Sequence, residues 1–397
     1  MMDPLKPDTL LATLGRDPDS NAGLVNPAVQ RGSTVLYPTL DALQNVRREY
    51  GRVYYGRHGT PTTIALQDAL TALDGAAGTI IVGSGAAAIS TAMIGFLSQG
   101  DHVLIGDCVY EPSRKFTERV LKRFGVTATY YDPAIGAGIA ALITPRTRVI
   151  LVEAPGSQTF EMMDVPAIAA AARARGVVTI MDNTWATSLY CKPLALGVDI
   201  SVQSATKYIG GHSDILLGAI ACNAATLETV RAAFGDFGHH AAPDDCWLAL
   251  RGLRTMSVRL ERHHATGLKL AAYFAGRPEV KRVLHPAMAG DPGHALWKRD
   301  FTGASGLFGV VLQPTTRAGL AAFVDGLQLF GMGYSWGGYE SLCLPANPAH
   351  ARTAVPWTEN GQLLRIHAGL EDPRDLIADL DAAFARRAAA EAAAPAP

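Results

Sequence analysis

The sequence predicts an α/β protein built around a mostly parallel β-sheet with helices on both faces. From about residue 59 to 250, helix-like stretches alternate with short apolar runs. This alternation is typical of strands joined by crossover helices, which run parallel to one another. Two of the runs, Arg148–Val152 and Val177–Met181, are almost continuously apolar, as expected of strands buried on both faces.

The remaining elements follow from the same patterns. The stretch from Gly75 to Gly100 has no charged residue and is long enough to span a bilayer, but glycine, serine and threonine interrupt it. We therefore expect a buried strand, a glycine turn and a buried helix there. The candidate strands are Thr79–Val82, His102–Ile105, Val126–Tyr131 and Val198–Gln203, and the candidate helices are Thr62–Leu73, Ala86–Leu97 and Pro166–Arg175.

Composition divides the chain into three parts. Residues 1–58 are polar and rich in proline. We expect them to form an arm that packs against other structure and does not form a domain of its own. Residues 59–252 form the large α/β domain. Residues 253–397 are richer in helix, with strand candidates at 310–313 and 363–367, and form a smaller C-terminal domain. Its last helix has one apolar face, and we expect the Ala/Pro-rich tail, 388–397, to fray.

Bulk properties exclude several classes of partner. The formal net charge is -1, so no basic excess exists to bind nucleic acid. The five cysteines are scattered and never form a CxxC pair, which favours reduced thiols in the cytoplasm over disulfides or a zinc site. The first ten residues lack an apolar signal core, so we expect a cytoplasmic protein without a membrane segment. The adjacent pairs His239-His240 and His263-His264 have poor geometry for one ion, and we predict no metal.

A carboxylate and a lysine follow two predicted strands. Asp182 comes directly after Val177–Met181, and Lys207 lies 25 residues later, after Val198–Gln203. Ligands of open α/β sheets bind at these carboxyl ends. A carboxylate there can keep a pyridinium nitrogen protonated, and a lysine can form an imine with a cofactor and move a proton. For either residue alone, a structural carboxylate or a surface lysine would be the better interpretation.

A glycine turn after the first predicted strand indicates a phosphate site. Val82-Gly83-Ser84-Gly85-Ala86 joins that strand to a helix, whose first amides and dipole can hold a phosphate. The same residues match the dinucleotide fingerprint, and Asp107 could then bind a ribose. An NAD-binding oxidoreductase is therefore an alternative, but it leaves Asp182 and Lys207 without a role.

Two further residues have an alternative structural interpretation. Tyr110, which follows the strand that ends near Ile105, could stack on a planar cofactor or simply be a core tyrosine. Arg365 interrupts the apolar strand candidate Leu363–His367, and a buried guanidinium needs an anion. A substrate carboxylate or an internal ion pair would each supply one.

Taken together, these motifs resemble the Cys/Met-metabolism family of fold-type I pyridoxal-phosphate (PLP) enzymes, from about Ala22 to Phe384. The most specific segment is SATKYIGGHSD, residues 204–214. Two segments, Glu153–Ser157 and Tyr334–Ser341, resemble the cystathionine β-lyase branch in particular. Relatives that act at Cγ usually have an asparagine-proline pair in the first segment and a smaller residue in place of Trp336.

The resemblance implies a large domain of the aspartate aminotransferase type and a role for each motif. Lys207 would carry the cofactor as a Schiff base and act as acid and base. Asp182 would pair with the pyridinium nitrogen, and Tyr110 would stack on the ring. The phosphate would be held by Gly85, Ala86, Ser204 and Thr206, and the substrate would be bound by Arg365, Ser335, Trp336, Tyr55 and His58.

The resemblance also implies that two subunits form each site. Tyr55 and Arg57 would reach the phosphate of a neighbouring subunit, with Tyr55 also near the substrate amine. The dimer would then be the catalytic unit of a homo-oligomer, usually a tetramer in this family. The arm, residues 1–58, would pack across that interface.

The implied reaction is α,β-elimination from a sulfur amino acid, which yields a thiol, pyruvate and ammonia. Cystathionine would give homocysteine, a step of methionine synthesis. His58 and Lys115 stand where this branch tends to have an arginine and an acidic residue. An imidazole holds a carboxylate less firmly than a guanidinium does, so cystine or another S-substituted cysteine is an alternative substrate.

Two different functions also fit the resemblance. One is a γ-acting enzyme, such as a methionine γ-lyase or a cystathionine γ-synthase, and its product would be 2-oxobutanoate in place of pyruvate. Trp336 and the segment Pro155-Gly156-Ser157 favour pyruvate. The second is a regulatory protein that keeps PLP and signals through a partner, but the sequence has no basic patch that supports it.

Overall fold

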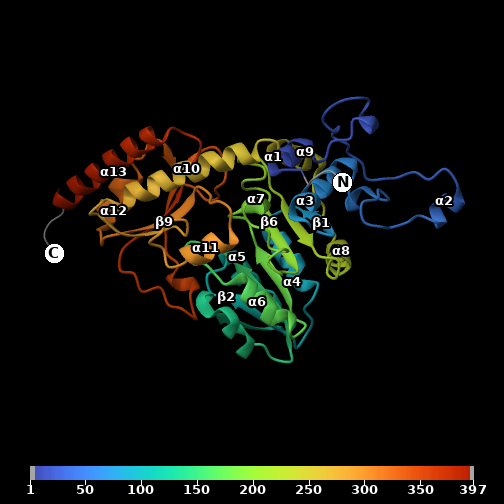
Figure 1. Cartoon of the computed structure of the whole chain (residues 1–397), viewed down its shortest axis with the longest axis horizontal. Helices are drawn as coiled ribbons and strands as arrows, with labels where there is room; N and C mark the ends of the chain where they lie inside the picture. The colour runs from blue at the N-terminus through green and yellow to red at the C-terminus, as the bar shows by residue number, and fades with distance from the viewer. Residues whose placement is uncertain (1–4, 394–397) are drawn as a thin grey trace.

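The computed structural model describes residues 5–393. Its larger sheet has the strand order β1-β7-β6-β5-β4-β2-β3 (Figure 1). Strands β2 to β6 are parallel, whereas β7 lies antiparallel between β1 and β6. The strands are β1 (Gly78–Val82), β2 (His102–Gly106), β3 (Thr127–Tyr131), β4 (Thr147–Glu153), β5 (Val178–Asp182), β6 (Ile200–Ser204) and β7 (Gly218–Cys222).

Helices cover both faces of this sheet, because successive side chains of a strand point to opposite faces. Val103 and Ile180 share an apolar cluster with α4 and α8. Their neighbours Leu104 and Met181 share a different cluster with α6. The helices of this unit are α3 (Pro61–Asp74), α4 (Gly85–Ile94), α5 (Glu111–Arg119), η3 (Leu121–Phe124), η4 (Pro133–Ala141), α6 (Val165–Arg173), α7 (Thr187–Tyr190), α8 (Leu227–Asp236) and α9 (Pro243–Leu253).

A smaller sheet, with the order β10-β11-β12-β9-β8, forms the core of the C-terminal part. Leu364 and Ile366 pack with α10, α12 and α13 on one face, whereas Leu363 joins the apolar cluster of the larger unit on the other. The elements are α10 (Met256–Ala275), β8 (Val280–Leu284), α11 (His294–Asp300), β9 (Leu307–Leu312), α12 (Arg317–Val324), β10 (Phe330–Gly331), β11 (Ser341–Ala346), η5 (Ala349–Ala351), β12 (Leu363–His367) and α13 (Pro373–Ala393).

From residue 5 to the start of α3 the chain forms an arm, whose first helix packs on the body through buried Leu11 and whose later part is extended. It carries the short helices α1 (Pro7–Thr13), η1 (Asp19–Asn21), α2 (Leu40–Gln44) and η2 (Gly56–His58). The segment with α2 stands away from the body of the protein, at the right of Figure 1. Leu36 is 88% exposed and Leu40 is 68% exposed, although both side chains are apolar. Apolar side chains gathered on an extended segment are typical of a surface that another chain covers.

The α/β fold class is confirmed, and the predicted strands and helices are present with ends shifted by a few residues. The sequence does not predict the antiparallel strand β7 or the short strands β8, β10 and β11. The expectation that the tail frays is wrong as far as Ala393, because α13 continues to that residue. Its alanines favour helix, and Arg387 pairs with Glu391 at 3.0 Å. Residues 394–397 lie outside the described part.

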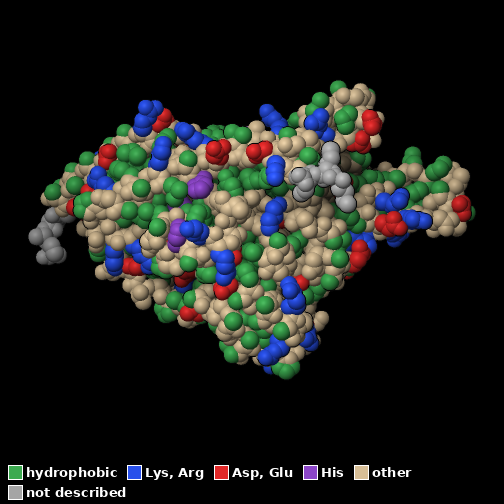
Figure 2. Space-filling model, in the orientation of Figure 1, with side chains coloured by type: hydrophobic (Ala, Val, Ile, Leu, Met, Phe, Trp, Pro, Cys, Tyr) green, Lys and Arg blue, Asp and Glu red, His purple; other side chains and the backbone are tan. Residues whose placement is uncertain are grey.

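The surface mixes acidic and basic side chains. On the face drawn in Figure 2 they are interspersed, in keeping with the net charge of -1. Within residues 5–393, no helix combines the length and the apolar character needed to cross a bilayer. In the same part of the chain, no three histidine, cysteine or carboxylate side chains are grouped as a metal ion would require.

Candidate active site

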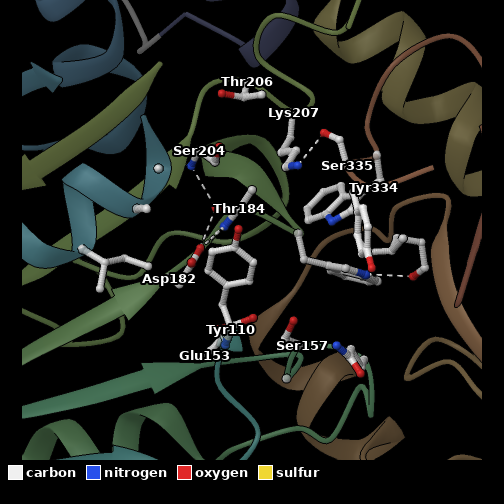
Figure 3. A pocket seen from close by; sticks show the side chains of 18 of the residues that line it. Tyr110, Glu153, Ser157, Asp182, Thr184, Ser204, Thr206, Lys207, Tyr334 and Ser335 are labelled. Atoms are coloured by element: carbon white, nitrogen blue, oxygen red, sulfur yellow. Dashed lines mark hydrogen bonds between the residues drawn. The ribbon is translucent and has the colours of Figure 1, made fainter. Parts of the chain in front are cut away.

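A cavity of about 380 Å³ lies at the carboxyl ends of the strands of the larger sheet (Figure 3). Because β1, β2, β4, β5 and β6 all run in the same direction, the residues that follow them meet at one edge. The smaller unit closes the cavity with the loop before β11 and with β12. The lining includes Gly85, Ala86, Tyr110, Glu153, Asp182, Thr184, Ser204, Thr206, Lys207, Tyr334, Ser335, Trp336 and Arg365.

Asp182 ends β5 and is held in place by Thr184. The Thr184 hydroxyl donates a hydrogen bond of 2.5 Å to Asp182 Oδ1, and the Thr184 backbone N–H donates a second to the same oxygen at 3.0 Å. Burial raises the pKa of the Asp182 carboxyl, while these hydrogen bonds and the charge of Lys207 work in the opposite direction. The arrangement fixes one carboxylate at the floor of the cavity.

Lys207 lies in the turn after β6, on another wall of the cavity. Its Nζ donates a hydrogen bond of 2.6 Å to Ser335 Oγ and lies 5.2 Å from the centre of the Trp336 ring. Burial lowers the pKa of Lys207 to about 8, the charge of Arg365 adds to this effect, and Asp182 opposes it. Near pH 8, about half of this lysine is therefore the uncharged amine, which can act as a nucleophile or base.

The glycine turn between β1 and α4 forms the third wall. Ser84 caps α4 by accepting a hydrogen bond of 3.1 Å from the Ala87 N–H. A Cβ atom at Gly85 would lie 2.6 Å from the Ser204 side chain, so only glycine allows this close approach. Thr206, also in the turn after β6, exchanges hydrogen bonds with Leu217. The N-terminus of α4 and two hydroxyl side chains thus surround one small space that suits an anion.

The residues predicted to bind a substrate carboxylate lie together. Arg365, on β12, donates a hydrogen bond of 2.9 Å from Nη2 to the backbone oxygen of Ser335. Trp336 follows Ser335 in the same loop. Across the cavity, Tyr110 is 43% exposed, and its backbone N–H donates a hydrogen bond of 2.6 Å to Glu153 Oε2. One chain therefore brings together Lys207 and every predicted site residue except those of the arm.

The arm residues do not reach this cavity in their own chain. Arg57 Nη1 donates a hydrogen bond of 3.0 Å to the Gly235 oxygen, and the His58 ring packs against Tyr54 and Phe234. Tyr55 is 47% exposed, next to these residues. Lys115, also outside the cavity, pairs with Glu111 at 2.7 Å. The roles predicted for Tyr55, Arg57 and His58 require the cavity of another subunit.

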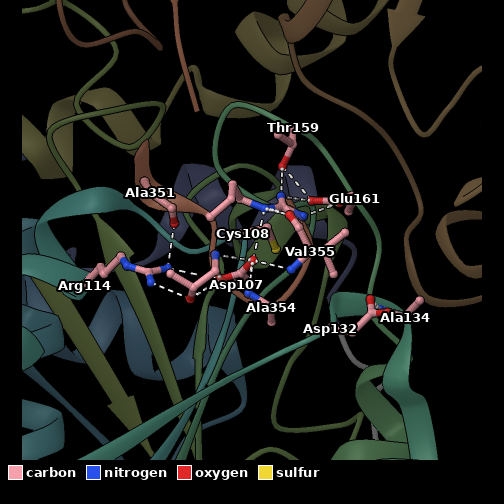
Figure 4. A network of polar contacts seen from close by, with 12 residues as sticks. Asp107, Cys108, Arg114, Asp132, Ala134, Thr159, Glu161, Ala351, Ala354 and Val355 are labelled. Atoms are coloured by element: carbon pink, nitrogen blue, oxygen red, sulfur yellow. Dashed lines mark hydrogen bonds and ion pairs between the residues drawn. The ribbon is translucent and has the colours of Figure 1, made fainter. Parts of the chain in front are cut away.

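Asp107 is engaged in a buried network (Figure 4) and cannot serve as a ribose ligand. Its carboxylate accepts a hydrogen bond from Arg114 at 3.0 Å and lies 3.3 Å from Arg352. It also accepts hydrogen bonds from the backbone N–H groups of residues 353–355. Burial opposes its charge, but these hydrogen bonds and ion pairs hold its pKa below the usual value. The dinucleotide alternative is therefore wrong for Asp107, which instead anchors the segment after η5.

Glu153 is a cavity residue that the sequence analysis does not identify as part of the site. It ends β4, directly beside Asp182 on β5 in the sheet register. Burial and the charge of Asp182 raise the pKa of Glu153 well above its usual value, so Glu153 is the protonated member of the pair. The available signal is the same as for Asp182: a carboxylate at the end of an apolar strand. The sequence motifs include Thr184 and Tyr334 but predict no role for either residue, since a single hydroxyl side chain in a loop carries no comparable pattern.

Comparison with known proteins decides the family. Residues 8–385 match the family model described as "Cys/Met metabolism PLP-dependent enzyme". The chain belongs to this family. The family is one of PLP-dependent enzymes, as the resemblance predicted.

Individual relatives cover nearly the whole chain. The cystathionine beta-lyase of Escherichia coli is 44% identical, over 96% of this chain and 98% of that protein. The L-alanine/L-glutamate racemase of Wolbachia pipientis is 38% identical, over 96% and 98%. The solved structure of cystathionine gamma synthase from Xanthomonas oryzae, in complex with aminoacrylate and cysteine, has a TM-score of 0.89 and 31% identity, and the match covers 98% of this chain and 100% of that one.

The Asp107 network predicts a large stability difference between two aspartates. Asp107→Ala removes the buried acceptor of Arg114 and of the backbone N–H groups of residues 353–355, although Arg114 and Arg352 keep their contacts with Glu118 and Glu161. We expect a loss of about 3 kcal/mol in unfolding free energy. Asp132→Ala is the matched control, because exposed Asp132 only caps η4 and its loss costs about 1 kcal/mol. Urea unfolding followed by tryptophan fluorescence measures the stability of both variants. Equal losses would contradict the stabilising role of the Asp107 network.

The shifted pKa of Lys207 predicts how the apoenzyme takes up PLP. Only the uncharged amine attacks the aldehyde, so the rate should rise with pH and reach half of its limit near pH 8. Arg365→Leu removes a positive charge that favours the uncharged form, so the midpoint should move to higher pH. Stopped-flow absorbance after mixing apoenzyme with PLP gives both profiles. A wild-type midpoint near 10.5, or no shift in the variant, would show that Lys207 is not perturbed in this way.

Proposed function

We propose that this protein is a PLP-dependent carbon–sulfur β-lyase that cleaves cystathionine, or a related S-substituted cysteine or cystine, to a thiol, pyruvate and ammonia. One observation carries the proposal. Lys207 and Asp182 line the same cavity as Arg365 and Ser335, so a cofactor-binding lysine and a carboxylate-binding pair face one small space. The name of the Escherichia coli relative supports the same reaction.

The cavity residues fit PLP in charge and shape. The N-terminus of α4, with Gly85 and Ala86, and the hydroxyls of Ser204 and Thr206 suit the phosphate. Asp182, fixed by Thr184, would pair with the pyridinium nitrogen. The Tyr110 ring offers a face for stacking.

When bound, PLP supplies an electron-withdrawing ring that stabilises negative charge at Cα of the substrate. The chain's own contribution is to move protons and to hold the amino acid. The uncharged Lys207 amine would remove the Cα proton, and the burial that lowers the pKa of Lys207 favours this form. The thiolate then leaves from Cβ, and the remaining three-carbon fragment hydrolyses to pyruvate and ammonia.

Orientation of the substrate comes from the smaller unit. Arg365 presents a guanidinium beside Ser335, which suits a bidentate hold on an α-carboxylate. Trp336 narrows the cavity next to Lys207, and its ring lies 5.2 Å from Nζ. A large ring at this position favours elimination at Cβ over the longer reach needed at Cγ.

We propose that two subunits complete each site. Exposed Tyr55 and neighbouring Arg57 extend into the cavity of the partner chain, where Arg57 would meet the phosphate and Tyr55 the substrate amine. The exposed apolar side chains of the arm, residues 1–58, support its burial on a second copy. The catalytic unit is then a dimer of chains with a large domain, 59–252, and a small domain, 253–397. We further propose that dimers pair into a homotetramer in the cytoplasm.

The preferred sulfur substrate depends on the far end of the cavity. His58 would face the distal carboxylate of cystathionine, and burial and the charge of Arg57 lower its pKa, so the ring is mostly neutral at pH 7. Lys115, which pairs with Glu111, would offer the distal ammonium no acidic partner. Both effects favour S-substituted cysteines that lack a second amino-acid group.

The direct test is the product. Purified enzyme reconstituted with PLP should absorb visible light, lose that absorption in Lys207→Ala, and release pyruvate from L-cystathionine or S-methyl-L-cysteine. Lys298→Ala, a lysine on α11 outside the cavity lining, is the matched control and should keep both properties. Pyruvate from neither substrate would overturn the proposal.

Each competing function predicts a different product when the same enzyme is tested with L-cystathionine, S-methyl-L-cysteine and L-alanine. Release of 2-oxobutanoate would identify a γ-acting enzyme, in line with the synthase structure at 31% identity. Conversion of L-alanine to D-alanine without pyruvate would identify a racemase, the activity named for the Wolbachia relative. Visible absorption with no turnover of any of these compounds would favour a regulatory protein that keeps the cofactor.

A further inference from the structure

A buried histidine lies on the same face of β12 as Arg365. His367 is two residues further along the strand, so its side chain points to the same side of the sheet. It is 1% exposed and packs against the rings of Tyr208 and His263, at 6.0 Å and 5.2 Å between centroids. The proposed reaction does not use this imidazole.

Both ring nitrogens of His367 bond to one loop. The Gly337 backbone N–H donates a hydrogen bond of 3.1 Å to Nε2, so Nε2 carries no proton. Nδ1 lies 3.0 Å from the backbone oxygen of Glu340 and therefore carries the proton that it donates there. Complete burial and the charges of His263, Arg365 and Lys207 lower the pKa of His367 well below its usual value. The neutral ring thus ties together two points of the loop that precedes β11.

That loop contacts Lys207 directly. Ser335 accepts the hydrogen bond from Lys207 Nζ, and its backbone is in the left-handed region at a φ of 81°. A serine keeps such a conformation only where its surroundings enforce it. Gly337 has a φ of 87°, and a Cβ atom there would lie 3.0 Å from the backbone of Lys207. Small movements of the loop would therefore displace Ser335 from the lysine.

We propose that His367 is a positioning residue that holds Ser335 and Trp336 against Lys207 and so sets the substrate-carboxylate end of the cavity. The inference rests on the proposed function, which assigns substrate binding to Ser335 and Arg365. His367 acts through the backbone of Gly337 and Glu340 and does not line the cavity itself.

His263 provides a matched comparison inside the same cluster. It is 0% exposed and packs against the same Tyr208 ring, at 5.2 Å between centroids. Its Nδ1 donates to the backbone oxygen of Ala368 at 2.7 Å, outside the loop. If packing against Tyr208 alone mattered, replacing either histidine would change KM and the exchange of the Gly337 amide to the same extent.

The test uses holoenzyme and four variants, with pyruvate release from the substrate that the wild-type enzyme turns over. In His367→Leu both loop bonds are lost, and we expect KM to rise about tenfold with a smaller change in kcat. His367→Gln can still accept from Gly337 N–H and should return KM to within about threefold of wild type. His367→Asn can still donate to the Glu340 oxygen but loses the acceptor for Gly337 N–H, so KM should remain raised, unlike in His367→Gln. His263→Leu should leave KM unchanged.

Hydrogen–deuterium exchange gives a readout that does not depend on turnover. The amide of Gly337 should exchange faster in His367→Leu than in wild type, and at the wild-type rate in His263→Leu. If His367→Leu does not fold, the comparison of His367→Asn with His367→Gln carries the test.

The outcomes separate the two proposals. Failure of the wild-type enzyme to release pyruvate counts against the proposed function alone, because exchange at Gly337 still reports on His367. An unchanged KM and unchanged exchange in His367→Leu, or the same changes in both leucine variants, would overturn the positioning role.

Discussion

The burial of the Lys207 amine beside Arg365 and opposite Asp182 is the interaction on which the rest of the site depends. A lysine in water is almost fully charged at neutral pH and can neither attack an aldehyde nor remove a proton. Burial next to a guanidinium lowers the pKa of this lysine. The Asp182 carboxylate favours the charged form and so limits the size of the shift. The two carboxyl groups at the strand ends differ in charge. Glu153 is protonated because burial and the charge of Asp182 raise its pKa, so Asp182 is the charged partner of Lys207.

This balance requires contributions from two sheets. The larger sheet supplies Asp182 and Lys207 because its parallel strands end at one edge. The smaller sheet supplies Arg365 and His367 because alternate residues of β12 point to the face opposite Leu364 and Ile366, which share an apolar cluster with α12 and α13. The Asp107 network binds the segment after η5 to the end of β2 and thereby fixes one unit against the other. The residues proposed for cofactor chemistry and those proposed for substrate recognition thus come from separate parts of the chain.

Much of this arrangement could be predicted from sequence. The apolar runs before Asp182 and Lys207 locate both residues at strand ends, and the glycine turn before α4 locates the anion site. The predictions failed where a role depends on contacts between distant segments. Asp107 follows a strand as a ribose ligand would, and only its contacts with residues 353–355 reveal a structural role. His367 looks like one more residue of a buried strand until the loop at Gly337 is seen to bond to it. The helix α13 continues to Ala393, and Glu391 near its end is contacted by Thr315, from the segment before α12, as well as by Arg387.

The most direct measurement of the central claim is the site of cofactor attachment. The enzyme reconstituted with PLP is treated with borohydride, which makes the attachment permanent, and its tryptic peptides are then analysed by mass spectrometry. The account predicts a phosphopyridoxyl group on Lys207 alone, and no labelled peptide from Lys207→Ala. Labelling of another lysine in place of Lys207, or labelling that persists in the variant, would contradict it.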